Sequence, residues 1–333
     1  MKKKAVSAVI ILIFIAVLFI CLSNKENVSG YNLNDSNVVM ESYEGEPVVR
    51  LLLSNDNKVI TLKLEDYIKG VVSAEMPAEF STEALKAQAV AARTYAVTHM
   101  GAYNGRQYDK ANNIDLVDTV ECQVYMDTAV RLNSWPKDKR DEYLKKINEA
   151  VDSTRGEVIT YNGNVISDPF FFSCSSGKTE NSEDVFSSAE PYLRSVASME
   201  DKQAPSYEHT VKITNGEFIK KINSKYSTAN LKNYKLSSQV AVISRTETGT
   251  IKKVKVGSVT MTGLQFRMLL GLSSANINMK FYGNYIEFDT RGYGHGVGMS
   301  QWGANFMGKN GDTYKTIIKH YYQGVSIDRL KYK

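Results

Sequence analysis

Residues 70–97, GVVSAEMPAEFSTEALKAQAVAARTYAV, carry the break between two helices around which the chain is organised. The segment LEDYIKGVVSA, which leads into this stretch, predicts a short helix. Its apolar face consists of Leu64, Tyr67, Ile68, Val71 and Val72. A proline disfavours helical geometry in the residue before it. Glu75, next to the Met-Pro pair, is therefore expected at or just past the helix end, where its side chain can project into a cleft.

The second helix begins at a cap supplied by Ser81 or Thr82. Its slim apolar stripe, suited to close packing, consists of Leu85, Ala89, Ala92 and Ala96. Lys86 and Arg93 lie seven residues apart and so share a face, with Gln88 on the same helix. Both cations are expected to point the same way.

Outward from this stretch, strands and helices are interleaved along the chain. VVRLLL and VITLKL predict two short strands from Val48 onward, and EVITYNGNVISDPFFFSCS predicts a hairpin that turns at Asn162-Gly163. Further segments with a helical pattern follow, the last of them DTYKTIIKHYYQG near the C-terminus. Asp312 is the expected N-cap of that helix. We predict an α+β fold, with residues 48–333 forming a single large mixed helix and antiparallel-sheet domain that holds a substrate cleft.

The charge balance argues against nucleic-acid binding. The 333 residues carry a formal charge of +5. Three of the positive charges belong to Lys2, Lys3 and Lys4, and without them the basic and acidic residues are nearly equal in number. Nucleic-acid binders usually show a concentrated basic face.

The N-terminal segment predicts an uncleaved membrane anchor in preference to a removed signal peptide, because no convincing A-x-A cleavage pattern follows its apolar run. Residues 5–22 form an unbroken apolar run without charge or proline, near the lower end of the roughly 17–25 residues that a transmembrane helix needs. The three lysines before it place residues 1–4 in the cytoplasm. Residues 23–47 are polar and predict a tether. The expected location is the cell membrane, crossed once, with the folded part outside the cytoplasm.

Three motifs together resemble one family. GVVSAEMPAEFSTEALKAQAVAARTYAV, FFSCSSGKTENSEDVFSSAEPYLRSV and GYGHGVGMSQWGA resemble the signature segments of the stage II sporulation protein D (SpoIID) family, with its amidase-enhancer branch. The resemblance implies a peptidoglycan lytic transglycosylase that cleaves the MurNAc–GlcNAc bond with a 1,6-anhydro product, during septal wall degradation in sporulation engulfment. It also implies two partners, the amidase SpoIIP and the membrane protein SpoIIM.

A single carboxyl group suffices for such chemistry. Hydrolytic glycosidases use two carboxyl groups. In a transglycosylase the attacking group is the substrate's own C6 hydroxyl, so one carboxyl can protonate the leaving oxygen and then deprotonate that hydroxyl. We assign Glu75 to both roles. An ion pair with Arg93 would lower the carboxyl pKa and weaken the acid. Arg93, Lys86 and Gln88 are therefore assigned to substrate binding. The two cations are expected to bind the lactyl carboxylates of peptide-free glycan.

The other candidate substrate-binding residues lie in the second and third motifs. The third motif has four glycines between Gly292 and Gly298, a density typical of backbone that passes close to a ligand or adopts positive φ. The candidates from both motifs are Ser176, Lys178, Thr179, His295, Gly296, Ser300 and Gln301, and the family resemblance adds Tyr192.

The cysteines leave alternatives open. Outside the anchor, Cys122 and Cys174 can form a disulfide or stay as thiols. The spacing of cysteines and histidines gives no support for zinc, and we expect no metal and no cofactor. One rival function is a cysteine peptidase that uses Cys174 and His295. The other is a non-catalytic wall-binding protein that stimulates a peptidoglycan amidase.

Overall fold

A computed structural model describes residues 31–32, 45–233 and 235–330. The predicted anchor at 5–22 and most of the tether at 23–47 lie outside these ranges. Within them, no helix combines the length and apolar character that crossing a bilayer requires. The described chain is a mixed α+β structure with several small sheets, which confirms the predicted class.

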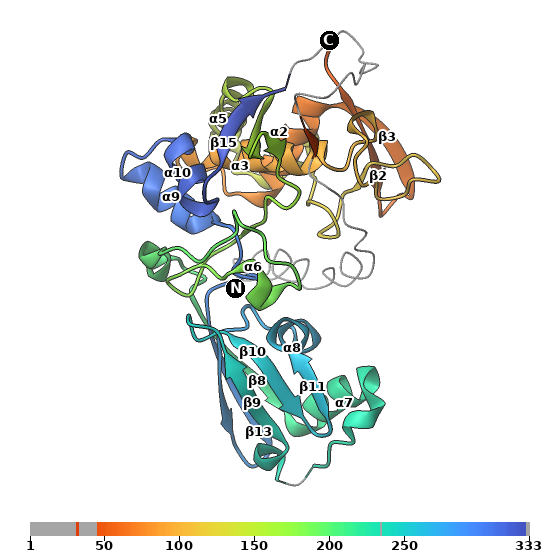
Figure 1. Ribbon diagram of the computed structural model, residues 1–333, viewed down its shortest axis with the longest axis vertical. Helices are drawn as coiled ribbons and strands as arrows, with labels where there is room; N and C mark the ends of the chain where they lie inside the picture. The colour runs from red at the N-terminus through yellow and green to blue at the C-terminus, as the bar shows by residue number, and fades with distance from the viewer. Residues whose placement is uncertain (1–30, 33–44, 234, 331–333) are drawn as a thin grey trace. The chain divides into compact units, whose positions relative to one another are not determined.

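The chain divides into two compact units (Figure 1). Unit 1 is Met1–Phe170 with Met307–Lys333, and unit 2 is Phe171–Phe306. The sequence predicted a single domain without such a boundary. No polar linker marks either junction, since β7 (Phe171–Phe172) pairs in parallel with β14 (Met299–Ser300) and α9 (Gln301–Lys309) runs through the second junction. Unit 2 lies between the two parts of unit 1 in the sequence. It begins in a strand and ends inside a helix, so no linker composition marks its boundaries.

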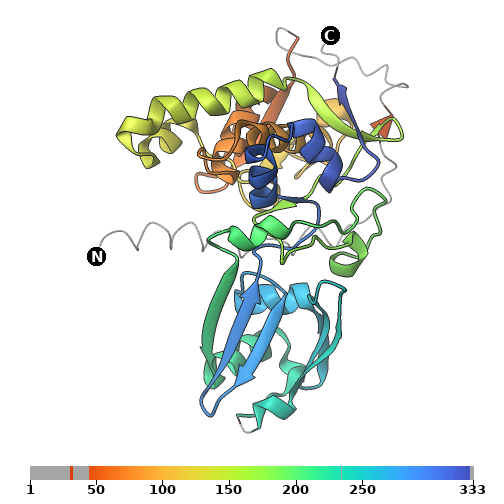
Figure 2. The ribbon, with the colours of Figure 1, turned by 90° about the vertical axis from the view of Figure 1, so that its left-hand side faces the viewer.

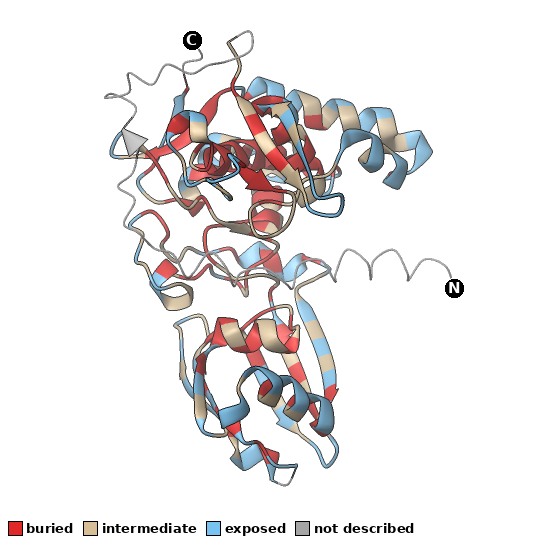
Figure 3. Ribbon diagram, turned by 90° about the vertical axis from the view of Figure 1, so that its right-hand side faces the viewer, coloured by how far each residue is buried: buried red, intermediate tan, exposed pale blue. Residues whose placement is uncertain are grey.

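Unit 1 is built around α3 (Thr82–Val97), which contacts one helix before it in the chain, α2 (Leu64–Glu75), and two helices after it, α5 (Arg140–Ser153) and α10 (Tyr314–Tyr321). Its alanines, buried as predicted, let α2 and α5 approach closely. The Ser81 hydroxyl accepts a hydrogen bond from the Ala84 N–H, which confirms the predicted cap. Figure 3 shows α5 with buried residues on one side and exposed residues on the other.

Two small sheets complete unit 1. In the first, β2 (Val48–Leu53) lies between antiparallel β3 (Lys58–Lys63) and parallel β4 (Leu116–Val117). The second has the order β1 (Tyr31–Asn32), β6 (Asn164–Val165), β5 (Glu157–Tyr161) and β15 (Ser326–Arg329). Asn162 and Gly163 both have positive φ between β5 and β6, which confirms the predicted hairpin. Among the described residues, unit 1 also contains the helices α4 (Thr128–Ser134) and α10 (Tyr314–Tyr321).

The cap of α10 differs by one residue from the prediction. Thr313, rather than Asp312, accepts a hydrogen bond from a first-turn N–H. Both residues are good caps, so the sequence alone does not separate them.

Unit 2 packs two three-stranded antiparallel sheets and two helices around one apolar core (Figure 2). One sheet has the order β12 (Ile277–Phe281), β13 (Tyr285–Arg291) and β8 (Glu208–Thr214). The other has the order β11 (Val259–Thr262), β10 (Ile251–Val256) and β9 (Val240–Arg245). Helices α7 (Asn215–Lys225) and α8 (Gly263–Leu270) contribute Phe218 and Phe266 to the core, where both rings contact Phe288. A short helix, α6 (Ser182–Val185), precedes them.

Candidate active site

Glu75 is the last residue of α2, as the Met-Pro pair predicted. It is partly buried, and one carboxylate oxygen accepts a hydrogen bond from the Val124 N–H at 3.0 Å. Burial raises the pKa of the Glu75 carboxyl from 4.5 to about 7, and the Val124 hydrogen bond opposes this rise. The position at a helix C-terminus also disfavours negative charge. The side chain is thus poised to hold a proton near neutral pH and to release it.

The loop that carries Val124 is held against α2 by close aromatic packing. The ring of Tyr125 stacks on that of Tyr67, with centroids 5.7 Å apart. Gly70 makes this possible, because a Cβ there would lie 2.2 Å from the Tyr125 ring. The only signal for this contact in the sequence was a glycine inside a helical pattern.

Tyr67 was assigned from the sequence to the apolar face alone. Its side chain is fully buried, and burial raises its pKa well above the usual value, with Cys122 and the Glu75 carboxylate adding to the effect. The Glu75 carboxylate thus adds to the burial that keeps the Tyr67 hydroxyl protonated.

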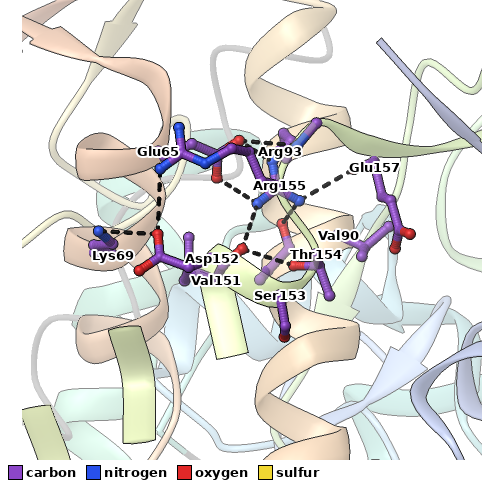
Figure 4. A network of polar contacts seen from close by, with 12 residues as sticks. Glu65, Lys69, Val90, Arg93, Val151, Asp152, Ser153, Thr154, Arg155 and Glu157 are labelled. Carbon is purple, nitrogen blue, oxygen red and sulfur yellow. Dashed lines mark hydrogen bonds and ion pairs between the residues drawn. The ribbon is translucent and has the colours of Figure 1, made fainter. Parts of the chain in front are cut away.

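The structure corrects the expectation that Arg93 faces an anionic sugar. Arg93 is completely buried, and its guanidinium forms two hydrogen bonds to the Glu65 carboxylate, at 2.9 and 2.5 Å (Figure 4). The backbone carbonyl of Glu157 accepts another hydrogen bond from it at 3.1 Å, and the Gly156 N–H donates to Glu65. Arg93 therefore ties α3 to α2 and to the start of β5. Its partner is Glu65, and Glu75 keeps its raised pKa.

Lys86 and Gln88 occupy different environments. The Lys86 ammonium pairs with Glu83 at 2.7 Å and lies 5.7 Å from the centre of the Tyr314 ring. The other Glu83 oxygen accepts the Tyr314 N–H at 2.7 Å, so Lys86 is anchored where α3 meets α10. Gln88 is fully buried, which removes it from direct contact with a ligand in this conformation.

Unit 2 contains a pocket that brings together four of the predicted residues. Ser176, Lys178, His295 and Gly296 line it, together with Cys174 and Glu180 among others. Gly296 has positive φ, and a Cβ there would lie 2.9 Å from the Glu180 side chain. The loop therefore packs its backbone directly against Glu180. All four glycines between Gly292 and Gly298 have positive φ, as the glycine density predicted.

His295 is held by the backbone through both ring nitrogens. Its Nε2 lies 3.0 Å from the Phe171 carbonyl oxygen, which requires a proton on Nε2, and its Nδ1 accepts the Val297 N–H at 3.1 Å. Burial lowers the pKa of the imidazole to about 3, with Arg267 adding to the effect. A neutral ring in this tautomer has no lone pair available to act as a general base.

Cys174 is poorly suited to nucleophilic catalysis. Burial raises the pKa of its thiol to about 12, and the thiol contacts the Ser206 carbonyl oxygen at 3.7 Å. The thiolate is the reactive form of cysteine. The geometry therefore speaks against a Cys174/His295 peptidase. Cys122 and Cys174 are not joined in a disulfide.

The other candidates from the second and third motifs are buried and support the loops around them: Thr179, Tyr192, Ser300 and Gln301. Thr179 accepts the Val196 N–H at 2.9 Å. Ser300 accepts the Gly303 N–H at 3.1 Å near the start of α9. Their contacts shape the segment that carries the pocket-lining residues.

Three carboxylates of unit 2, Asp289, Glu183 and Glu180, each have a partner within that unit. Asp289 pairs with Lys280, and Arg194 pairs with Glu183 and lowers the pKa of that carboxyl to about 2. Glu180 accepts a hydrogen bond from the Thr248 hydroxyl. Within the part of the chain that the structure describes, no group of three or more His, Cys, Asp or Glu side chains could hold a metal ion.

Comparisons with known proteins agree with these motifs. A family model described as SpoIID, stage II sporulation protein, matches residues 54–161, which include Glu75 and α3. Stage II sporulation protein D of Bacillus subtilis (strain 168) is 41% identical over 289 residues, which are 86% of this chain and 81% of that protein. The Bacillus amyloliquefaciens protein of the same name is 40% identical over 290 residues, 86% of this chain and 79% of its own length.

A more distant relative represents another branch. The amidase enhancer of Bacillus subtilis (strain 168) is 28% identical over 310 residues, which are 78% of this chain and 40% of that protein. At 41% identity over most of both chains, the first relative decides the assignment. The chain belongs to the stage II sporulation protein D family.

Proposed function

We propose that the protein is a lytic transglycosylase that cleaves the MurNAc–GlcNAc bond of peptidoglycan glycan strands, with Glu75 as acid and then base. The observation that carries the proposal is the raised pKa of the Glu75 carboxyl, about 7, at the end of α2. A general acid works best when its pKa lies near the operating pH. Glu75 combines this pKa with partial exposure.

The proposed reaction needs one proton and no water. The Glu75 carboxyl donates its proton to the glycosidic oxygen as the bond from that oxygen to C1 breaks. The resulting carboxylate takes the proton of the C6 hydroxyl, whose oxygen then bonds to C1 and closes the 1,6-anhydro ring. Glu75 ends the cycle protonated. The Val124 N–H stabilises the carboxylate between the two steps.

Sugar contacts are proposed for the pocket residues of unit 2. Ser176 and Lys178 offer a hydroxyl and an exposed ammonium, while His295 and Gly296 shape the backbone around them. Lys86 stays a proposed substrate contact, since it is partly exposed despite its pairing with Glu83.

The proposed setting is septal wall degradation during engulfment in sporulation. The family name of the relatives supports a role in sporulation. Residues 5–22 are proposed to anchor the protein in the cell membrane, with the catalytic part outside the cytoplasm. The amidase SpoIIP and the membrane protein SpoIIM are the proposed partners.

A pair of matched variants tests the proposal. Purified glycan strands are incubated with the wild type, with Glu75→Gln and with Glu79→Gln, and the products are separated by mass. Glu79 is exposed, lies four residues away and accepts a hydrogen bond from Tyr143, so it is the control carboxyl. We expect anhydro-ended fragments from the wild type and from Glu79→Gln, and none from Glu75→Gln. Equal cleavage by both variants would remove Glu75 from the mechanism.

A second candidate is a non-catalytic stimulator of an amidase, which the name of the amidase enhancer relative favours. Under this alternative, Glu75→Gln retains full stimulation of a purified amidase, and neither the wild type nor the variant releases glycan fragments alone. The same incubations, repeated with and without amidase, separate the two candidates.

A further inference from the structure

Basic residues are concentrated in one segment of unit 2. Of the 41 Lys and Arg residues in the chain, 11 lie between residues 218 and 286. Of the 36 Asp and Glu residues, only Glu247 lies there. The near balance of charge over the whole chain conceals this asymmetry. Such a block points to an anionic partner.

Six lysines of this segment are exposed and form no ion pair with any described residue: Lys220, Lys221, Lys232, Lys235, Lys253 and Lys255. We call them the lysine surface. Lys253 and Lys255 stand on the central strand β10, whose Val254 and Val256 point into the core. Their neighbours across the sheet are small, since Lys255 lies opposite Thr260 and Ala241. Their ammonium groups are therefore accessible from solvent.

The lysine surface covers more than one side of the core. Helix α8 packs on the core side of β10 and β11, and α7 contacts α8 and β8. Lys220 and Lys221 lie on the exposed part of α7, which Figure 3 shows as mostly exposed. Lys253 and Lys255 extend from the opposite face of the sheet. A flat bilayer can meet only one of these sides, whereas a flexible polymer can follow both.

The arginines of the segment are engaged elsewhere. Arg245 donates hydrogen bonds to the carbonyl oxygens of Gly249 and Ile277, and Arg267 donates to those of Leu272 and Ser273. The planar fork that binds carboxylate or phosphate in a fixed bidentate geometry is thus absent from the lysine surface, which offers point charges that can bind the single charge of each phosphodiester without a fixed geometry. Tyr282 is the one strongly exposed aromatic residue in the described part of the segment, too few for the stacking platforms of single-stranded nucleic-acid sites.

We propose that the lysine surface binds a linear phosphodiester polymer of the cell envelope, of the poly(glycerol phosphate) kind. The repeated single charges of such a chain complement scattered ammonium groups, and its flexibility lets it contact both sides of unit 2. The binding goes beyond the proposed cleavage of glycan and does not involve Glu75. It would hold the protein in the wall between encounters with substrate.

The test measures binding of the full chain to fluorescently labelled poly(glycerol phosphate) between about 50 and 200 mM salt, where contacts between a cation and a polyanion weaken steeply. The variant Lys253→Glu/Lys255→Glu reverses two exposed charges. The control variant Lys110→Glu/Lys137→Glu reverses two exposed lysines of unit 1. We expect the first variant to bind roughly tenfold more weakly and with a flatter salt dependence. The control should bind like the wild type.

Three results would overturn the proposal: no binding by the wild type, equal weakening in the control variant, or tighter binding to an oligonucleotide, a carboxylate-bearing glycan or phosphatidylglycerol vesicles at equal anionic charge. Circular dichroism of each variant verifies folding. Glycan cleavage by Lys253→Glu/Lys255→Glu is measured alongside, so that loss of polymer binding with retained cleavage separates this inference from the proposed function.

Discussion

Replacing Glu75 by Gln should make the protein more stable at neutral and alkaline pH. In the folded state burial raises the pKa of this carboxyl from 4.5 to about 7. Below pH 4.5 the carboxyl is protonated in both the folded and the unfolded state, so the raised pKa does not lower the free energy of unfolding. Between pH 4.5 and about 7 the unfolded state ionises while the folded state resists, and the free energy of unfolding falls. Above about pH 7 the loss is complete.

The size of the effect follows from the pKa difference. A shift of one pKa unit corresponds to about 1.4 kcal/mol, so the rise from 4.5 to about 7 costs at most about 3 kcal/mol. A Gln side chain cannot ionise and escapes this cost, while its carbonyl oxygen can still accept the Val124 hydrogen bond. The advantage of Glu75→Gln over the wild type should therefore grow by up to about 3 kcal/mol between about pH 4 and about pH 8.

Urea denaturation of the full chain at a series of pH values measures this advantage. Trp135, buried in unit 1 against Tyr143, reports the unfolding of the unit that contains Glu75. Glu79→Gln is the control for replacing a nearby carboxyl by an amide. A constant offset for Glu75→Gln across the range would refute the reasoning, because it would mean that the carboxyl ionises in the folded protein as it does in the unfolded chain.

Four further predictions follow from the same contacts. Cleavage of glycan should fall tenfold per pH unit above about pH 7, because the acid must be protonated; a pH–rate profile without a limb near 7 would contradict the role of Glu75. Arg93→Met should lower the free energy of unfolding by about 3–5 kcal/mol, since it leaves Glu65 buried without its cation, and a stable variant with weakened glycan binding would restore the sugar-binding assignment. Gly70→Ala usually strengthens a helix, but here the new methyl group meets the Tyr125 ring, so urea denaturation should show lower stability and assays lower activity. Cys174→Ser should keep glycan cleavage, and loss of activity in a folded variant would revive the cysteine peptidase.

The local structure was largely readable from the sequence. The cap at Ser81, the end of α2 at Glu75 and the Asn162-Gly163 turn each follow from residues within a few positions of one another. The capping box of α8 is a similar case, since Thr262 and Gln265 satisfy each other's N–H groups, and Gly271 ends the helix with positive φ. Such features depend on short-range rules.

The buried position of Arg93, which the sequence assigned to substrate binding, shows where those rules stop. Glu65 and Glu75 both lie on α2, ten residues apart, and nothing in the sequence marked Glu65 as the partner of Arg93. The choice between them depends on how α2 crosses α3 and on where β5 begins, since Gly156 and Glu157 complete the polar shell around the pair. These are long-range contacts without a sequence signal. The same holds for the hydrogen bond that reaches Glu75 from Val124, 49 residues away.

The most direct test of the central claim is whether oxygen from water is incorporated into the cleavage products. Glycan strands are digested by the wild type in H₂¹⁸O, and the fragment ends are examined by mass spectrometry. The account predicts 1,6-anhydro ends without ¹⁸O, because the C6 hydroxyl of the sugar closes the ring with Glu75 as the only acid and base. Reducing ends that carry ¹⁸O would mean hydrolysis with a second activating group, and would contradict the mechanism.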